Sequence, residues 1–216
     1  MSWDAEYNKY KEIWGEQPSE LALEAGKRLV YNKGRSLRVL DVGCGYGRDS
    51  IYFAKSLGFR VLGVDISERA IEMARENSLK AEAKRAEFKV SDFRALNSYF
   101  DVIHISNLYH LLPPGGRVDL ASHTTRLLGP DGTLYLNAIS VNDREHYGVG
   151  IPVDGQVNTW NDGGKTIHLS TEEEMRHAFP ELRIRELYEH DYDEPHPGSR
   201  THYHKAWILV AGKDAA

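Results

Sequence analysis

The stretch VLDVGCGYG, residues 39–47, decides the predicted fold of this chain. An apolar, strand-like run leads directly into three glycines at alternate positions, Gly43, Gly45 and Gly47, and a helix-like segment follows. Glycine lets the chain turn sharply and lets a ligand approach backbone that a Cβ would shield, while a helix start offers unpaired N–H groups. Glycine turns also occur for steric reasons alone, but this context favours a ligand-binding loop between a strand and a helix.

The same alternation of strand and helix continues outward from this loop and predicts an α/β fold. Residues 48–57, 67–77, 117–128 and 171–179 have helical spacing. Ser67 and either Ser170 or Thr171 are predicted helix N-caps, and Gly58, Gly129 and Pro130 predict helix ends. Strand-like apolar runs cover residues 38–41, 60–64, 86–90, 101–106, 133–138, 183–189 and 206–210.

Size and composition restrict the function. A chain of 216 residues suits one domain, residues 1–216, with a sizeable core. The net charge of −5 disfavours a basic face for a phosphate backbone, although a local basic patch could survive that average, so we expect a small-molecule partner and no nucleic acid. No apolar run is long enough to span a bilayer, so we expect no membrane partner. The single cysteine, Cys44, excludes an internal disulfide, and the N-terminus reads as no targeting peptide. We expect a cytoplasmic monomer or homodimer.

The glycine loop, with Asp41 two residues before its first glycine, resembles motif I of the class I S-adenosylmethionine (SAM)-dependent methyltransferases. The dinucleotide fingerprint GxGxxG would need glycine where Arg48 stands. The resemblance extends from about residue 37 to the end and implies a Rossmann-like, seven-stranded, mostly parallel sheet with helices on both faces and an antiparallel last strand. The aromatic, helical N-terminus broadly resembles the tellurite-resistance and thiopurine methyltransferase group.

The resemblance also implies where SAM binds. The counterpart of Asp41 lies near the methionine part of SAM, Asp65 matches the ribose-binding acid, and Asp92 matches the acid that contacts adenine. The alternative for Asp92 is a turn or helix cap, because Ser and Asp often cap after a strand. The implied cofactor-binding residues are Asp41, Gly43, Cys44, Gly45, Gly47, Asp65, Ile66, Asp92, Phe93, Ser106 and Asn107.

The end of the fourth strand is predicted to face the transferred methyl group, because open α/β sheets bind ligands at the carboxyl ends of their strands. His110 follows there and is either a general base, suited by its ordinary pKa near 6.5, or a packing residue beside the cofactor. Asn107 is not followed by the Pro-Pro-aromatic sequence of enzymes that methylate nucleic-acid bases. The lone Cys44 disfavours arsenite as the acceptor.

Two segments are predicted to cover the acceptor. Residues 1–35 form a helical N-terminal cover in which Trp3, Tyr7, Tyr10 and Trp14 share one side of a helix. Residues 141–169 form a glycine-containing insertion without a sustained period, either a lid or a static surface loop. The predicted substrate-binding residues are Tyr10, Trp14, Tyr147, Trp160 and His168.

A polar stretch from residue 189 to His204 holds the densest group of titratable side chains. His202 and His204 would share one face of a strand, and imidazoles beside carboxylates could bind a metal. Because no known ligand pattern is present, we favour a polar hairpin turn and assign no metal site.

The sequence therefore predicts an enzyme that transfers the methyl of SAM to a nucleophilic oxygen, nitrogen or sulfur of a small molecule. The alternative is a non-catalytic SAM-binding regulatory protein. It would keep the glycine loop without a competent acceptor pocket.

Overall fold

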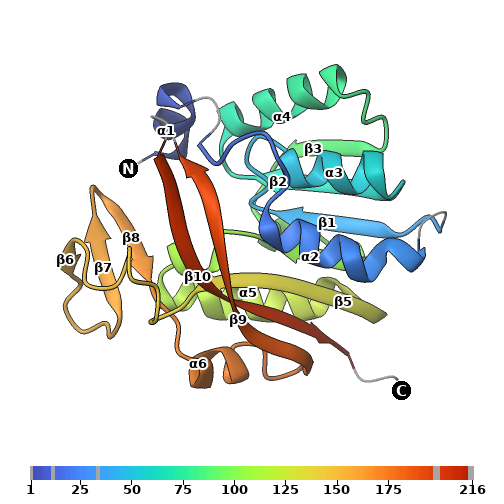
Figure 1. Ribbon diagram of the computed structural model, residues 1–216. Helices are drawn as coiled ribbons and strands as arrows, with labels where there is room; N and C mark the ends of the chain where they lie inside the picture. The colour runs from blue at the N-terminus through green and yellow to red at the C-terminus, as the bar shows by residue number, and fades with distance from the viewer. Residues whose placement is uncertain (1, 11–12, 33–34, 197–199, 214–216) are drawn as a thin grey trace.

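A computed structural model describes residues 2–10, 13–32, 35–196 and 200–213. Within these residues, seven strands form one sheet in the order β3-β2-β1-β4-β5-β10-β9 (Figure 1). β1 pairs in parallel with β2 and β4, β2 with β3, and β4 with β5, whereas β10 is antiparallel to both β5 and β9. The predicted Rossmann-like sheet with an antiparallel last strand is confirmed.

The strands of the main sheet, all predicted but several longer than expected, are β1 (Arg38–Val42), β2 (Arg60–Asp65), β3 (Ala86–Val90), β4 (Phe100–Ile105), β5 (Leu128–Ile139), β9 (Arg183–His196) and β10 (Arg200–Gly212). The α-helices are α1 (Trp3–Lys9), α2 (Glu20–Leu29), α3 (Arg48–Ser56), α4 (Glu68–Lys80), α5 (Pro114–Leu127) and α6 (Glu172–His177). Three short 3₁₀ helices are η1 (Val30–Asn32), η2 (Phe93–Ala95) and η3 (Tyr109–Leu111). No described helix is long and apolar enough to span a bilayer.

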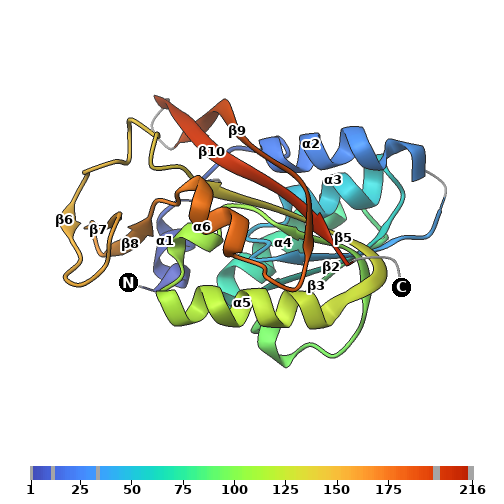
Figure 2. The same cartoon turned by 90° about the horizontal axis from the view of Figure 1, so that it is seen from below.

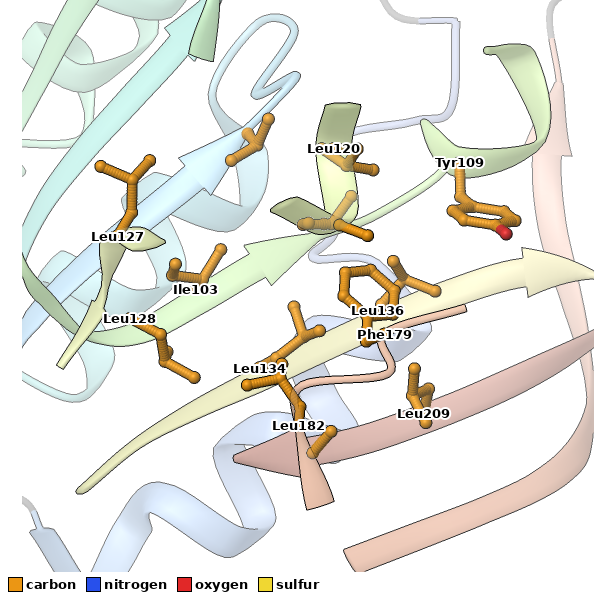
Figure 3. Close-up of a cluster of buried hydrophobic side chains, with 14 of the residues drawn as sticks. Ile103, Tyr109, Leu120, Leu127, Leu128, Leu134, Leu136, Phe179, Leu182 and Leu209 are labelled. Carbon is orange, nitrogen blue, oxygen red and sulfur yellow. The ribbon is translucent and has the colours of Figure 1, made fainter. Parts of the chain in front are cut away.

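Helices cover both faces of the sheet, with α2 and α3 on one side and α5 on the other (Figure 2). On the α5 and α6 side, the fully buried Ile103, Leu120 and Leu136 belong to the large apolar cluster drawn in Figure 3. On the opposite side, Leu21 and Phe53 pack with sheet residues in a second cluster. The rigid two-sided core holds the carboxyl ends of β1, β2, β4 and β5 along one edge.

Helix capping follows the sequence signals at two starts. The Ser67 hydroxyl accepts a hydrogen bond from the Ala70 N–H at 3.0 Å, and the Thr171 hydroxyl accepts one from the Glu174 N–H at 3.1 Å. The predicted helix stop at Gly129 and Pro130 is confirmed, because α5 ends at Leu127, but the strand that follows begins earlier than predicted. Both residues lie inside β5, which begins at Leu128 directly after α5, so the chain changes from helix to strand without an intervening loop.

The N-terminal helix is shorter than predicted, because α1 ends at Lys9. Tyr10 and Trp14 therefore lie beyond it, although both still pack with Trp3 and Tyr7 in one aromatic cluster. The Tyr46 hydroxyl donates to the Gly15 carbonyl at 2.6 Å and accepts from the Trp14 N–H at 3.1 Å. Hydrogen bonds to the glycine loop, rather than helix geometry, position Trp14.

The insertion 141–169 contains a small antiparallel sheet that periodicity did not predict: β6 (Ile151–Pro152), β7 (Thr159–Asp162) and β8 (Lys165–His168). Figure 1 shows it projecting beyond the edge of the main sheet.

The predicted turn around residues 190–205 is also wrong for most of its length. Residues 190–196 and 200–205 pair as β9 and β10, while residues 197–199 lie outside the described residues.

Candidate functional site

A cavity of about 370 Å³ lies at the carboxyl ends of β1, β2 and β4. The glycine loop forms one wall, the residues after β3 and β4 form others, and Trp3, Tyr7 and Trp14 from the N-terminal segment reach it. Of the predicted cofactor residues, ten line this cavity: Asp41, Gly43, Cys44, Gly45, Asp65, Ile66, Asp92, Phe93, Ser106 and Asn107. The structure therefore brings together side chains spread over residues 3–119 in the chain.

The glycine loop needs its glycines for two different reasons. Gly43, Gly45 and Gly47 all have positive φ, which L side chains rarely adopt. A Cβ on Gly45 would lie 2.8 Å from the Tyr7 hydroxyl oxygen, so this glycine lets Tyr7 of α1 pack directly against the loop. Gly47 does not line the cavity, and a Cβ there would lie 2.9 Å from Phe88 and 3.0 Å from Ala74. Gly47, the N-cap of α3, therefore allows close packing against β3 and α4.

Asp65 ends β2 with its carboxylate facing the loop. One oxygen accepts a hydrogen bond from the Gly45 N–H at 3.0 Å and the other from the Ser67 N–H at 2.9 Å. Burial raises the pKa of this carboxyl, while these backbone donors favour its charged form. The contacts fix the carboxylate beside the loop and leave it on the cavity wall.

Asp41 lies deeper, at the base of the loop, and is 2% exposed. Its carboxylate accepts a hydrogen bond from the Ser50 hydroxyl at 2.6 Å, and burial raises its pKa. Asp49 from α3 takes hydrogen bonds from the Ser19 N–H and hydroxyl at 2.7 and 2.6 Å and lies 3.0 Å from His104 Nε2. These buried contacts tie α2, α3 and β4 together beneath the cavity.

Asp92 takes the capping role that the sequence left open, and its contact with adenine stays a prediction. It caps η2, because its carboxylate accepts the Arg94 N–H at 2.9 Å, and it also lines the cavity. The Arg94 guanidinium donates to the same carboxylate at 2.6 Å, and these bonds lower the pKa of Asp92. The neighbouring Phe93 also lines the cavity.

The end of β4 presents two polar side chains to the cavity. Ser106 Oγ is buried, and none of the described residues forms a hydrogen bond with it. Asn107 has φ of 54°, in the left-handed region that Asn tolerates better than most residues. Its N–H donates to Asn137 Oδ1 at 2.7 Å and its Oδ1 accepts from Asn137 Nδ2 at 3.0 Å, so β5 holds the strained turn in place.

A buried ion pair, not predicted from the sequence, lies beside Asn107 at the cavity wall. Arg48, the first residue of α3, donates to Glu194 of β9 at 2.5 Å, and the two side chains are 11% and 6% exposed. Asn107 Nδ2 lies 3.3 Å from the same carboxylate. Arg48 lines the cavity, and its pKa stays well above the ordinary value beside the two carboxylates Asp49 and Glu194, despite burial. The position of Arg48, a charged residue directly after the last loop glycine, could have marked it as a site residue. No feature of the sequence marks Glu194, 146 residues later, as its partner.

The predicted acceptor residues do not converge on this cavity. Trp14 lines it, but Tyr10, Tyr147, Trp160 and His168 do not. Tyr147 and Trp160 contact each other at 5.0 Å between ring centroids, and His168 is buried between the Thr159 hydroxyl and the Glu174 carboxylate. A second cavity between α1 and β8 is lined instead by Trp3, Leu111, Pro113, Gln156, Gly164, Lys165 and Thr166.

His110 lies in η3 behind the cavity wall, is 6% exposed and does not line the cavity. Burial, together with the nearby His146, His204 and His168, lowers the pKa of His110 to about 3. A histidine of such low basicity is a poor proton acceptor near neutral pH.

Comparisons with known proteins show which family has a sequence like this one. The sequence profile of the methyltransferase-domain family matches residues 39–132. An uncharacterized methyltransferase of Schizosaccharomyces pombe is 31% identical over 112 residues, which cover 50% of this chain and 76% of that protein. The chain belongs to the class I SAM-dependent methyltransferases.

Solved structures share the fold. A protein from a study of disulfide-to-thioacetal conversion in echinomycin biosynthesis has a TM-score of 0.77 at 22% identity, over 99% of this chain and 92% of that chain. Magnesium protoporphyrin IX methyltransferase of Synechocystis, solved with bound SAM, has a TM-score of 0.67 at 18% identity, over 97% of this chain and 91% of that chain. The narrower tellurite-resistance and thiopurine grouping stays a prediction.

The chemical groups that line the cavity suit SAM. The positive-φ glycines expose backbone, the Asp65 carboxylate can accept hydrogen bonds from hydroxyl groups, and Ser106 Oγ is a buried polar atom in need of a partner. SAM is the cofactor of this methyltransferase.

Proposed function

We propose that this methyltransferase transfers the methyl of SAM to a nucleophilic oxygen, nitrogen or sulfur of a small molecule. The observation that carries the proposal is the cavity itself. It runs from the glycine loop to the polar end of β4 beneath three aromatic side chains, and this enclosure suits a compact, partly apolar acceptor. The net charge of −5 also disfavours a nucleic-acid substrate.

We assign the cofactor contacts residue by residue within this proposal. Asp65 accepts hydrogen bonds from the ribose hydroxyls, and Asp92 with Phe93 contacts adenine. Gly43, Cys44 and Gly45 offer backbone along the cofactor, whereas Asp41 and Ser106 face its methionine part. Gly47 supports the loop through packing, because Phe88 and Ala74 occupy the space next to it.

When bound, SAM supplies a methyl group on a sulfonium that a nucleophile can displace in line. The chain contributes mainly position: fixed side chains hold the reactants and aromatic rings exclude water. The Arg48–Glu194 pair and Asn107, which contacts the same carboxylate, form the part of the cavity wall where donor and acceptor meet. We assign His110 the packing role, because it lies outside the cavity and its pKa is low.

The insertion 141–169 and α1 are proposed to form the acceptor side. Lys165 of β8 makes an ion pair with Glu6 of α1 at 2.5 Å and lies 5.6 Å from the centre of the Trp3 ring. These contacts join the two segments over the second cavity, which shares Trp3, Leu111 and Pro113 with the first. Gln156, Lys165 and Thr166 then replace Tyr147, Trp160 and His168 as the residues of the insertion that contact an acceptor.

A methylation assay tests the proposal. The protein is incubated with methyl-labelled SAM and, separately, a panel of small O, N and S nucleophiles, bulk RNA and unfolded protein. We expect S-adenosylhomocysteine to form in step with label in a small-molecule acceptor, and Asp65→Ala to slow this at limiting SAM. Label found only in RNA or protein would contradict the proposal.

We further propose a cytoplasmic location, consistent with a single, buried cysteine.

A further inference from the structure

Three potential metal ligands converge where the chain leaves β5 and meets the start of β10. The Asp143 carboxylate lies 3.0 Å from His146 Nδ1 through one oxygen and 3.8 Å from His204 Nδ1 through the other. The two imidazole rings stack with centroids 5.1 Å apart. One candidate ligand atom from each residue lies within 4.8 Å of the other two.

The surrounding backbone holds the Asp143 carboxylate in this position. Asp143 is fully buried, and one oxygen accepts the Glu145 N–H at 2.9 Å and the His146 N–H at 3.0 Å. The other oxygen accepts the Lys205 N–H at 2.8 Å. Hydrogen bonds of this kind orient the carboxylate ligands of metal sites.

The ligand chemistry selects a class of cation. Two neutral imidazoles and one carboxylate suit Zn²⁺ and related divalent transition metals, whereas Ca²⁺ and Mg²⁺ prefer oxygen ligands. Zn–N and Zn–O bonds of about 2.0–2.2 Å put tetrahedral ligand atoms roughly 3.3 Å apart. The observed separations, 3.0 Å from one Asp143 oxygen to His146 Nδ1 and 3.8 Å from the other oxygen to His204 Nδ1, lie near this value. His146 is 19% exposed and gives an ion a path from solvent.

We propose that Asp143, His146 and His204 bind one divalent transition-metal ion of the zinc class, with a fourth position open to water or an acceptor atom. His204 uses Nδ1, and its Nε2 faces the Glu194 carboxylate at 3.9 Å. A carboxylate behind a ligating histidine orients the ring and raises its basicity.

The position of this site connects it to the cofactor cavity. The same Glu194 carboxylate pairs with Arg48 and contacts Asn107, both of which line the cavity. A single side chain therefore separates the metal site from the wall where donor and acceptor meet. A second group, Glu20, Glu24 and His190, differs because Glu24 already pairs with Lys27 and Arg28 at the surface.

Zinc titration of the chelator-treated full chain tests this proposal. We expect calorimetry to show one Zn²⁺ per chain with micromolar or tighter affinity, and Co²⁺ to give visible ligand-field absorption that Zn²⁺ displaces. His146→Ala and His204→Gln should each weaken Zn²⁺ binding by about 100-fold or more, above the 10–100-fold typical of outer-shell changes.

His177→Ala is the matched control. His177 is an exposed histidine whose Nδ1 contacts the Glu173 carbonyl oxygen at 2.8 Å, four residues back. This variant should bind Zn²⁺ like the parent. Far-UV circular dichroism checks folding, and the half-buried His146 carries the test should the buried His204→Gln fail to fold. Absence of Zn²⁺ binding to the parent at about 100-fold molar excess, or equal affinity in folded His146→Ala and the control, would overturn the site.

Discussion

The glycine loop and the C-terminal hairpin of β9 and β10 meet at one edge of the sheet but are stabilised differently. The loop is defined by local backbone: positive φ at its glycines and N–H groups that bond within about twenty residues. The hairpin contributes through side chains that reach across the chain, as Glu194 does to Arg48. The first region forms one wall of the cavity, and the second, through Glu194, holds the cavity-lining residues Arg48 and Asn107.

The largest expected effect is on stability, in the hairpin. Glu194→Ala leaves the Arg48 guanidinium buried without its partner carboxylate and should lower the free energy of unfolding by about 3 kcal/mol. Glu186→Ala on the same strand removes the exposed partner of Arg28 and should cost at most about 1 kcal/mol. Urea denaturation measures both. Equal losses would show that the Arg48–Glu194 pair behaves like a surface pair.

The next effect is on cofactor binding, in the loop. Gly45→Val places a branched side chain at φ of 53° against Tyr7 and should weaken SAM binding by about 100-fold, or about 2.7 kcal/mol. Gly58→Val is the control, because Gly58 also has positive φ but no atom within 4 Å of its Cβ position. A similar loss of SAM affinity in both variants would attribute the effect to backbone strain alone.

A smaller loss is expected at the end of β2. Asp65→Ala removes a carboxylate that would accept hydrogen bonds from the cofactor, so SAM affinity should fall by about 1–3 kcal/mol. The exposed Asp131→Ala should leave SAM binding unchanged. Isothermal titration calorimetry decides, and unchanged affinity in folded Asp65→Ala would remove Asp65 from the site.

The contrast between the two regions also explains what the sequence could reveal. The loop, the caps at Ser67 and Thr171 and the mostly parallel sheet with an antiparallel last strand depend on neighbouring residues or on the shared family pattern, so they were predicted. The Arg48–Glu194 pair and the approach of Asp143 to His204 depend on residues 146 and 61 positions apart, and no local spacing marks them.

The lengths of two strands, β5 and β9, were predicted wrongly for a related reason. Gly129 and Pro130 follow the end of α5, as their stop signals predict, but they lie inside β5, which begins at Leu128, five residues before the predicted strand. The polar residues 190–196 look like a turn in isolation, but their pairing with β10 makes them a strand. Tertiary pairing overrides the local turn preference of residues 190–196.

The smallest expected effect on SAM binding comes from the insertion. Replacing residues 151–164 with a short Gly-Ser linker should change SAM affinity by less than about threefold, or 0.7 kcal/mol. Preference among acceptors should change by more, because the linker removes Gln156 and Gly164 from the second cavity. Parallel assays on two acceptors measure this. Unchanged preference with lower thermal stability would make the insertion a static loop.

The most direct test of the account is a calorimetric comparison of SAM, S-adenosylhomocysteine and NAD on the unmodified protein. Arg48 replaces the last glycine of the dinucleotide fingerprint and is fixed by Glu194, while Asp65 and the glycine loop line a cavity suited to an adenosyl group. We expect SAM and S-adenosylhomocysteine to bind one to one and at least about 100-fold more tightly than NAD, a difference of about 2.7 kcal/mol. Tighter binding of NAD would contradict the assignment of this cavity.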